Sequence, residues 1–292
     1  MNRSPLREIT DDEIRRYDAD GIVCLRGMFD ADWLARLAEL VEEDLAAPGP
    51  LTMELERSAA AGRGAAAGRF FFDTFMWTRM EGFREFVFCS PAAEIAARIS
   101  GSSRVNIFFD QLLIKESGTE EPTPWHNDLP YWPLDGARIS TVWLALDEVT
   151  RDSGAVEYVK GSHRWAAGYH PPAFAGDDRY KTDLPKLPDI EAMRDALDIA
   201  RFDLAPGDCT VHHALTVHGA PGNARADRRR RAVVTRWAGD GVVYRPRPNI
   251  QPMAWDPDIA PGGPIDSDLW PVVWTAACAP AAPGSRGRAG SA

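Results

Sequence analysis

The sequence has few cysteines, the residues that commonly form disulfide bonds in small exported domains or bind zinc. Only 4 of its 292 residues are cysteine, and no CxxC pair occurs among them. Closely spaced cysteine pairs are typical of zinc ribbons and dithiol redox sites, and a disulfide framework needs a higher cysteine content. The sequence therefore argues against these classes. We expect reduced, buried thiols at Cys24, Cys89, Cys209 and Cys278.

Basic charge and long apolar runs are also scarce. The chain has 33 Lys and Arg against 43 Asp and Glu, a formal net charge of -10, and its only dense basic run is Arg228 to Arg231. Since Lys and Arg that neutralise phosphates supply most non-specific affinity for nucleic acid, we expect no nucleic-acid partner. No apolar run is long enough to span a membrane, and residues 1–16 lack the apolar core of a signal peptide. We expect a soluble, cytoplasmic protein with no membrane partner.

The first hundred residues show helical periodicity. A hydrophobic fraction of 45% is ample for a full core. Apolar residues recur at helical spacing in Ala31 to Leu45, where Asp30 is a suitable N-cap, and Glu42 to Asp44 fall on the opposite face. We also predict helices over residues 11–17 and over Ser90 to Ser100 with Ser90 as its cap, a strand over Gly21 to Leu25, and a mobile loop over residues 56–69.

From residue 104 the apolar period shortens to about two, which indicates strands. A series of short strands separated by turns predicts a mainly β (α+β) fold, an antiparallel sandwich or barrel with the N-terminal helices packed outside. We interpret residues 1–278 as a single domain, 166–199 as a lid with a helix near 190–198, and 279–292 as a disordered tail. The predicted strands are Arg104 to Lys115, Trp125 to Trp132, Ile139 to Leu146, Ala155 to Val159, Ala200 to Leu204, Asp208 to His212 and Arg230 to Trp237.

Two of the six histidines lie in a context that suggests a metal site. His126 and Asp128 are two residues apart in a segment predicted as a strand, where side chains at i and i+2 point to the same face. His218 is the candidate third ligand, because it follows a predicted strand and precedes the turn residues Gly219 to Asn223. Two imidazoles and one carboxylate on one octahedral face form the facial triad of non-haem Fe(II) oxygenases.

A cation is predicted near this site on the strand that begins at Arg230. Arg230, Ala232 and Val234 share one face at a period of two, so Arg230 would be the one cation of an otherwise apolar inward row. A guanidinium there could bind a dicarboxylate through two parallel hydrogen bonds. In this interpretation most of the run Arg228 to Arg231 forms a solvated basic turn. Arg229 and Arg231 remain alternatives to Arg230 as the inward-pointing arginine, because the strand register can shift by one residue.

These residues carry a family resemblance. The His126-x-Asp128 pair, the distal His218 followed by G-x-x-x-N, and an arginine twelve positions later at Arg230 resemble the phytanoyl-CoA hydroxylase family of Fe(II)- and 2-oxoglutarate-dependent dioxygenases. Further similar segments are DGIVCLRGMF, DQLLIKESG, STVWLALDEV, DSGAVEYVKGSHRW and the APGD that precedes the distal histidine. The resemblance covers roughly residues 15–240.

The resemblance implies a double-stranded β-helix (jelly roll) that holds Fe(II) through His126, Asp128 and His218, with 2-oxoglutarate anchored by Arg230 and O2 as the oxidant. Matching also places Lys115 and Trp143 in the 2-oxoglutarate pocket. The family's hydroxyl residue two positions after the distal histidine is replaced by Ala220, so a neighbour such as Thr216 or Lys115 would have to assist Arg230. Because Asp128 is retained, halogenation is disfavoured.

We therefore expect hydroxylation of an unactivated C–H bond in a small, partly apolar metabolite, with release of succinate and CO2. Desaturation, epimerisation or cyclisation would leave the same signature, and an acyl-CoA substrate is an alternative. Two other classes remain open: a cupin-like metal isomerase or hydrolase without 2-oxoglutarate, and a non-catalytic sensor. We assign the other histidines to structural or supporting roles, with His212 or His213 able to face the pocket. The aromatic run Phe70 to Trp77 is assigned to core packing, with a substrate wall as the less favoured alternative.

Overall fold

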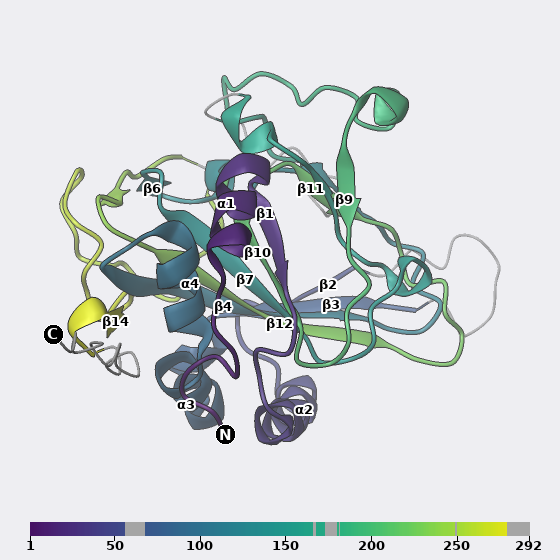
Figure 1. Ribbon diagram of the computed structural model, residues 1–292, viewed down its shortest axis with the longest axis horizontal. Coiled ribbons are helices and arrows are strands. Elements are labelled where there is room, and N and C mark those ends of the chain that lie inside the picture. Colours follow the sequence, from purple (N-terminus) through teal and green to yellow (C-terminus); the bar gives the residue numbers. More distant parts are fainter. Residues whose placement is uncertain (56–67, 166–167, 173–179, 181, 249, 279–292) are drawn as a thin grey trace, which may run out of the picture.

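The computed structural model is built on two facing antiparallel sheets (Figure 1). It describes residues 1–55, 68–165, 168–172, 180, 182–248 and 250–278. The larger sheet has the order β1-β10-β7-β12-β4-β3-β2, with β14 paired to β4. Its strands are β1 (Ile22–Leu25), β2 (Met53–Leu55), β3 (Phe70–Thr74), β4 (Arg104–Lys115), β7 (Ile139–Ala145), β10 (Cys209–His213), β12 (Arg230–Ala238) and β14 (Val272–Thr275).

The smaller sheet has the order β5-β11-β8-β9. It brings together segments that precede and follow residues 166–199, since β5 pairs with β11 and β11 with β8. A short two-stranded ribbon stands apart from both sheets. The strands of the smaller sheet are β5 (Thr123–His126), β8 (Glu157–Val159), β9 (Ile199–Arg201) and β11 (His218–Ala220), and those of the ribbon are β6 (Leu134–Asp135) and β13 (Val243–Tyr244).

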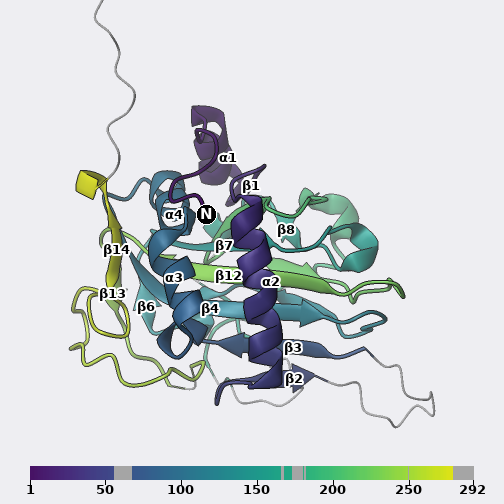
Figure 2. The same cartoon turned by 90° about the horizontal axis from the view of Figure 1, so that it is seen from below.

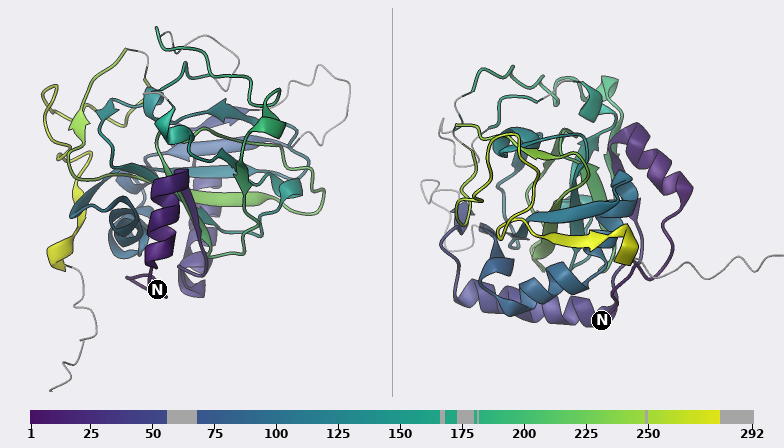
Figure 3. Two further views of the ribbon diagram at one scale, coloured as in Figure 1. Left: turned by 45° about the horizontal axis from the view of Figure 1, so that its top comes forward. Right: turned by 90° about the vertical axis from the view of Figure 1, so that its left-hand side faces the viewer.

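Helices cover one face of the larger sheet (Figure 3, right), and α2 and α3 cross its strands (Figure 2). The helices are α1 (Asp11–Asp20), α2 (Ala31–Ala46), α3 (Glu81–Cys89) and α4 (Ala92–Ser100). Local chemistry fixes their ends: Thr10 and Glu13 form a capping box at α1, and the Asp30 carboxylate accepts from Trp33 N at α2. The 3-10 helices are η2 (Met76–Thr78), η3 (Leu129–Tyr131), η4 (Arg151–Ser153), η5 (Ser162–Arg164), η6 (Arg194–Ala196) and η7 (Ala276–Cys278).

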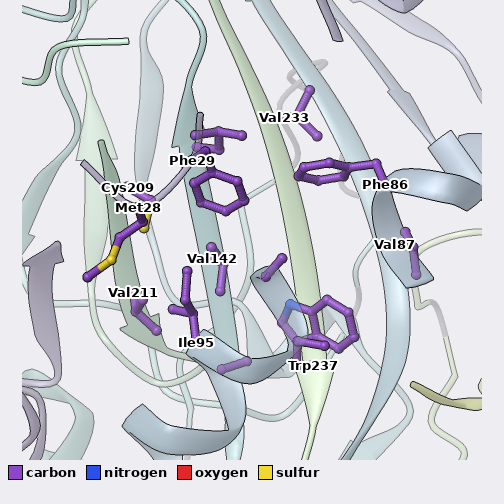
Figure 4. Close-up of a cluster of buried hydrophobic side chains, with 14 of the residues drawn as sticks. Met28, Phe29, Phe86, Val87, Ile95, Val142, Cys209, Val211, Val233 and Trp237 are labelled. Carbon is purple, nitrogen blue, oxygen red and sulfur yellow. The ribbon is translucent and has the colours of Figure 1, made fainter. Parts of the chain in front are cut away.

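The main hydrophobic core lies between these helices and the larger sheet. Figure 4 shows Phe86 and Ile95 of the helices beside Val142, Val233 and Trp237 of the strands. This packing turns one face of each central strand toward the helices, so the alternate side chains of β4, β7 and β12 point to the smaller sheet. The space between the sheets is therefore lined by every second residue. Within the described residues, no helix is long and apolar enough to cross a membrane.

The predicted fold class is confirmed, because two facing antiparallel sheets with outer helices form the expected β-rich double-stranded β-helix. Two local predictions were wrong, because the strand predicted over Trp125 to Trp132 ends at His126 and only the 3-10 turn η6 forms within 190–198. Helix α3 had not been predicted. The helix predicted from Ser90 begins at Ala92, with the Ser90 hydroxyl accepting from Ala92 N. The tail 279–292 and most of the predicted loop 56–69 lie outside the described residues.

Candidate metal centre and adjoining cavity

His126, Asp128 and His218 converge between the two sheets. Their ligating atoms all lie within 4.8 Å of one another, and all three residues are buried. His126 is the last residue of β5 and lies directly opposite His218 of β11, because the antiparallel register pairs these two residues. The Asp128 Oδ1 atom is 3.5 Å from His126 Nε2 and 3.9 Å from His218 Nε2. Two imidazole nitrogens and one carboxylate oxygen thus surround one point.

Backbone hydrogen bonds set the tautomers of both histidines. His126 Nδ1 lies 2.8 Å from the carbonyl oxygen of Pro124, and His218 Nδ1 lies 2.9 Å from that of Thr216. A carbonyl only accepts, so each Nδ1 carries the hydrogen and each Nε2 presents a lone pair. Burial lowers the pKa of His218, and the neighbouring His126 and His212 lower it further. His218 is therefore neutral at physiological pH, as metal ligation requires.

A turn rather than a strand face positions Asp128. The backbone at Asp128 has the helical values φ −74° and ψ −41° and starts η3. The amides of Asp128 and Leu129 both donate to the carbonyl oxygen of Ala214, in the loop between β10 and β11. The expectation that His126 and Asp128 share one strand face was thus wrong, since the strand ends at His126 and Asp128 lies in the following turn. The two ligands still meet because the chain folds over Ala214 immediately after β5.

The second oxygen of Asp128 is held by the larger sheet. The Thr141 hydroxyl donates to Asp128 Oδ2 at 3.2 Å, and His212 Nε2 lies 3.4 Å from the same atom. Burial alone would raise the pKa of Asp128, but its close contacts with His126 and His212 and the charge of Arg236 hold it well below its usual range. Asp128 is therefore an anion whose Oδ1 faces the two histidines. This donor set fits a divalent transition metal with open coordination positions.

A cavity of about 320 Å³ adjoins the three ligands. Side chains from both sheets line it, and most are apolar or aromatic. The charged lining residues among those described are Asp128, Arg230 and Arg236. The other lining residues that matter below are Phe70, Phe72, Gln111, Tyr131, Trp132, Thr141, Trp143, Tyr158, Tyr180 and His212.

Arg230 is a buried cation in this cavity. Its side chain is 2% exposed, and its Nε has no hydrogen-bond partner among the described residues. Burial lowers its pKa to about 10, so it stays charged at neutral pH. Lys115 lies opposite on β4, its Nζ donates to the carbonyl oxygen of Pro221 at 2.7 Å, and burial followed by the charge of Arg230 lowers its pKa. Lys115 is not among the residues that line the cavity. Within the described residues, neither side chain forms an ion pair with a carboxylate, which suits an anionic ligand.

The neighbouring arginines point elsewhere. Arg231 forms two hydrogen bonds with the carboxylate of Asp147, at 2.7 and 3.0 Å, and Arg229 pairs with Glu42. Neither lines the cavity, whereas Arg230 does. Of the alternatives left open by the sequence, the register of β12 thus puts Arg230 inward.

Trp143 lines the cavity, and Thr216 does not. The Arg230 guanidinium carbon lies 5.4 Å from the centre of a Trp143 ring. The Thr216 hydroxyl donates instead to the carbonyl oxygen of Gly21 at 2.7 Å, and a Cβ at Gly21 would lie 2.5 Å from that hydroxyl oxygen. The structure therefore removes Thr216 from the anion pocket, because its hydroxyl secures the end of α1.

Four polar residues of the cavity were missed or underrated by sequence reasoning. Thr141 and His212 contact Asp128, and Arg236 lies with Gln111 on the same cavity wall. The signal for Arg236 was available: it is separated from Arg230 by an even number of residues on β12, so both point inward. Gln111 likewise shares its face of β4 with Lys115.

The aromatic run was assigned to core packing, with a substrate wall as the less favoured alternative, and the structure shows both environments. Phe71 packs in the core, whereas Phe70 and Phe72 line the cavity from the opposite face of β3. Of the segment predicted as a lid, Tyr180 also lines the cavity, and the carbonyl oxygen of Pro172 accepts from the Tyr131 hydroxyl.

Comparison with known proteins gives consistent matches. The model of the family described as "Phytanoyl-CoA dioxygenase (PhyH)" matches residues 17–232. A protein of Caenorhabditis elegans named "Probable phytanoyl-CoA dioxygenase" is 27% identical over 130 residues, 41% of this chain and 37% of that protein. The aligned segment thus spans little more than a third of that relative's length.

Two solved structures align along almost the whole chain. The alpha ketoglutarate dependent carbocyclase SnoK from nogalamycin biosynthesis has a TM-score of 0.71 at 22% identity, covering 94% of this chain and 100% of its own. The epimerase SnoN, in complex with Fe3+, alpha ketoglutarate and nogalamycin RO, has a TM-score of 0.70 at 23% identity, covering 90% and 98%. These two likenesses establish the shared fold. Because the family model matches well over half of the residues, the chain belongs to the phytanoyl-CoA dioxygenase (PhyH) family.

Proposed function

We propose that the protein is an Fe(II)- and 2-oxoglutarate-dependent dioxygenase that hydroxylates an unactivated C–H bond of a small, partly apolar metabolite, releasing succinate and CO2. One observation carries the proposal: a His-Asp-His set and a buried arginine without a carboxylate partner among the described residues share one cavity. A metal isomerase or hydrolase with the same three ligands would not need the buried arginine, because it binds no 2-oxoglutarate. A cytoplasmic location remains a prediction.

In this proposal His126, Asp128 and His218 hold the iron, which supplies the oxidising chemistry with O2 and 2-oxoglutarate. Arg230 binds the distal carboxylate of 2-oxoglutarate, with the Lys115 amine beside it as a further hydrogen-bond donor. The geometry is compatible because the Arg230 guanidinium lies over Trp143, two residues along β7 from Thr141, which contacts Asp128. Trp143 forms one wall of this pocket.

The cavity also bears on the substrate. Its volume of about 320 Å³ has to accommodate 2-oxoglutarate and the reacting part of the substrate. The aromatic walls, which include Phe72, Tyr131 and Trp132, exclude water and hold an apolar body close to the metal centre. These features favour a compact metabolite over an acyl-CoA. They do not distinguish hydroxylation from epimerisation or cyclisation at the reacting carbon. The fold is shared with proteins named an epimerase and a carbocyclase.

The test is anaerobic addition of Fe(II) and 2-oxoglutarate to the purified protein. We expect the weak visible charge-transfer band of the iron–2-oxoglutarate chelate, and we expect His126→Ala to abolish it. Exposure to O2 should then convert 2-oxoglutarate to succinate, slowly without substrate. No band in the wild type, or the same band in His126→Ala, would refute the proposal. Mass analysis of the oxidised product distinguishes a gain of one oxygen from loss of two hydrogens or a mass-neutral inversion.

A further inference from the structure

A second buried arginine lies at the other end of the inward row of β12. Arg230, Ala232, Val234 and Arg236 share one face of β12, and Arg230, Val234 and Arg236 line the cavity. Six residues of strand separate the two arginines by roughly 20 Å between Cα atoms. Arg236 pairs with Thr141 in the sheet, and its Nε lies 3.9 Å from Asp128 Oδ2. Arg236 is thus beside the metal centre, whereas Arg230 enters from the other end of the strand.

Within the described residues, only part of the Arg236 guanidinium group has a hydrogen-bond acceptor. Its Nη2 donates to Gln111 Oε1 at 2.7 Å, while Nε and Nη1 are buried without hydrogen-bond partners. Asp128 does not supply the missing acceptor, because 3.9 Å is too long for a hydrogen bond. A guanidinium 8% exposed with unused donors is costly to bury unless a ligand completes it.

The surroundings of Arg236 fix it in place and leave only donors on the cavity wall. Its guanidinium carbon lies 4.4 Å from the Phe109 ring centre and 5.5 Å from that of Trp132. Since Gln111 Oε1 accepts from Arg236, the amide group that remains on Gln111 is a donor. Both side chains line the cavity, so the wall beside Asp128 offers hydrogen-bond donors to whatever occupies the space.

The charge balance indicates what the occupant is. Among the described lining residues, two arginines stand against the single carboxylate of Asp128. Bound Fe(II) and the dianion 2-oxoglutarate would cancel each other, so one positive charge would remain in a water-poor cavity. Arg230 pairs with the distal carboxylate of 2-oxoglutarate in the proposed function, whereas Arg236 lies beside the metal centre, where it can bind an anionic group of the primary substrate.

We propose that Arg236 and Gln111 bind an anionic oxygen group of the primary substrate, a carboxylate or an enolate-type oxygen, and so hold its apolar body against the aromatic wall beside the metal centre. This inference rests on the proposed function and adds the substrate class. Arg236 is a specificity-determining residue in this view, and Gln111 orients it and contributes a second donor.

The probes are three carboxylates and their neutral alcohols: benzoate and benzyl alcohol, phenylacetate and 2-phenylethanol, 2-naphthoate and 2-naphthalenemethanol. Each is titrated by calorimetry into the anaerobic enzyme saturated with Fe(II) and 2-oxoglutarate. We expect at least one carboxylate to bind tenfold or more tightly than its alcohol, the difference that a charge-assisted hydrogen bond produces. Arg236→Met should reduce this preference below about twofold, whereas Arg236→Lys, which retains the charge, should keep most of it.

Two further variants separate recognition from misfolding. Gln111→Glu would pair a carboxylate with Arg236 and should abolish the preference without removing the arginine. Arg15→Met, on an exposed position of α1, is the matched control and should behave as wild type. The charge-transfer band reports separately on the proposed function, because it depends on Fe(II) and 2-oxoglutarate alone.

Several outcomes would overturn the inference. No preference for any carboxylate, or a preference that survives both Arg236→Met and Gln111→Glu, would remove Arg236 from substrate recognition. Loss of the charge-transfer band on addition of a carboxylate would show that the probe displaces 2-oxoglutarate at Arg230, and this also counts against a separate anion site. A wild-type enzyme that shows no band at all would instead refute the proposed function.

Discussion

Replacing Arg230 with methionine should have opposite effects on cosubstrate binding and on stability. A bidentate guanidinium–carboxylate contact comprises two charge-assisted hydrogen bonds, and losing one such bond costs about 1.5–3 kcal/mol. We therefore expect the Kd for 2-oxoglutarate to rise about a hundredfold. Burial lowers the pKa of Arg230 from 12.5 to about 10, which corresponds to a cost of about 3 kcal/mol for keeping the charge in the empty cavity. Arg230→Met removes that cost, so the cosubstrate-free variant should unfold at a higher temperature.

The matched control is Arg231→Met, one residue along β12. Arg231 is paired with Asp147, so its loss should lower stability by about 1 kcal/mol and leave the Kd for 2-oxoglutarate within twofold of wild type. Anaerobic titration of 2-oxoglutarate into the Fe(II) enzyme gives both constants, and thermal unfolding without ligands gives both stabilities. Weaker binding in Arg231→Met than in Arg230→Met would refute the register of β12, and an unchanged Kd in Arg230→Met would refute the anchoring role.

Three further substitutions test other parts of the structure. Thr141→Val removes the hydroxyl that holds Asp128 Oδ2 and should weaken Fe(II) binding about tenfold in a competition titration, whereas Thr141→Ser should not. Burial raises the pKa of Asp110 to about 8, so the folded protein keeps a proton on this carboxyl group that the unfolded chain loses above about pH 4. The free energy of unfolding should therefore fall as the pH rises toward 8. Urea unfolding at several pH values measures this slope, and Asp110→Asn should flatten it. Thr216→Val should cost about 1 kcal/mol of stability and leave the Kd for 2-oxoglutarate unchanged, and a weaker Kd would restore Thr216 to the pocket.

Period-two patterning predicted the parts of the site that lie on long central strands. Strand β4 begins at Arg104 and ends at Lys115 as expected, and Arg230 occupies the inward position that its alternation with Ala232 and Val234 indicated. Long strands are predictable because both faces are constrained, one by the helices and one by the cavity, so a slip of one residue would bury the wrong side chains. The same rule applied six residues further would have found Arg236.

Short elements and hydroxyl roles were less predictable, since contacts distant in sequence decide them. Thr216 lies two residues before a ligand, yet its hydroxyl bonds to Gly21, almost two hundred residues earlier. The segment 190–198 has helical periodicity, but Arg194 pairs with Glu157 of β8 and Trp125 donates to Glu191, which ties the chain to the smaller sheet with only a 3-10 turn. No local pattern encodes these partners.

The His126-Asp128 pair shows how a correct site can follow from an incorrect local geometry. Spacing of two residues was taken to mean a shared strand face, but the strand ends at His126 and Asp128 lies in a helical turn held by the carbonyl oxygen of Ala214. The turn frees the carboxylate from the sheet, so Oδ1 can face the histidines while Oδ2 reaches Thr141 on the larger sheet. A carboxylate fixed on the strand could not bridge the two sheets in this way. The ligand geometry therefore depends on the packing of one sheet against the other, and a substitution that shifts the sheets should weaken metal binding even when all three ligands remain.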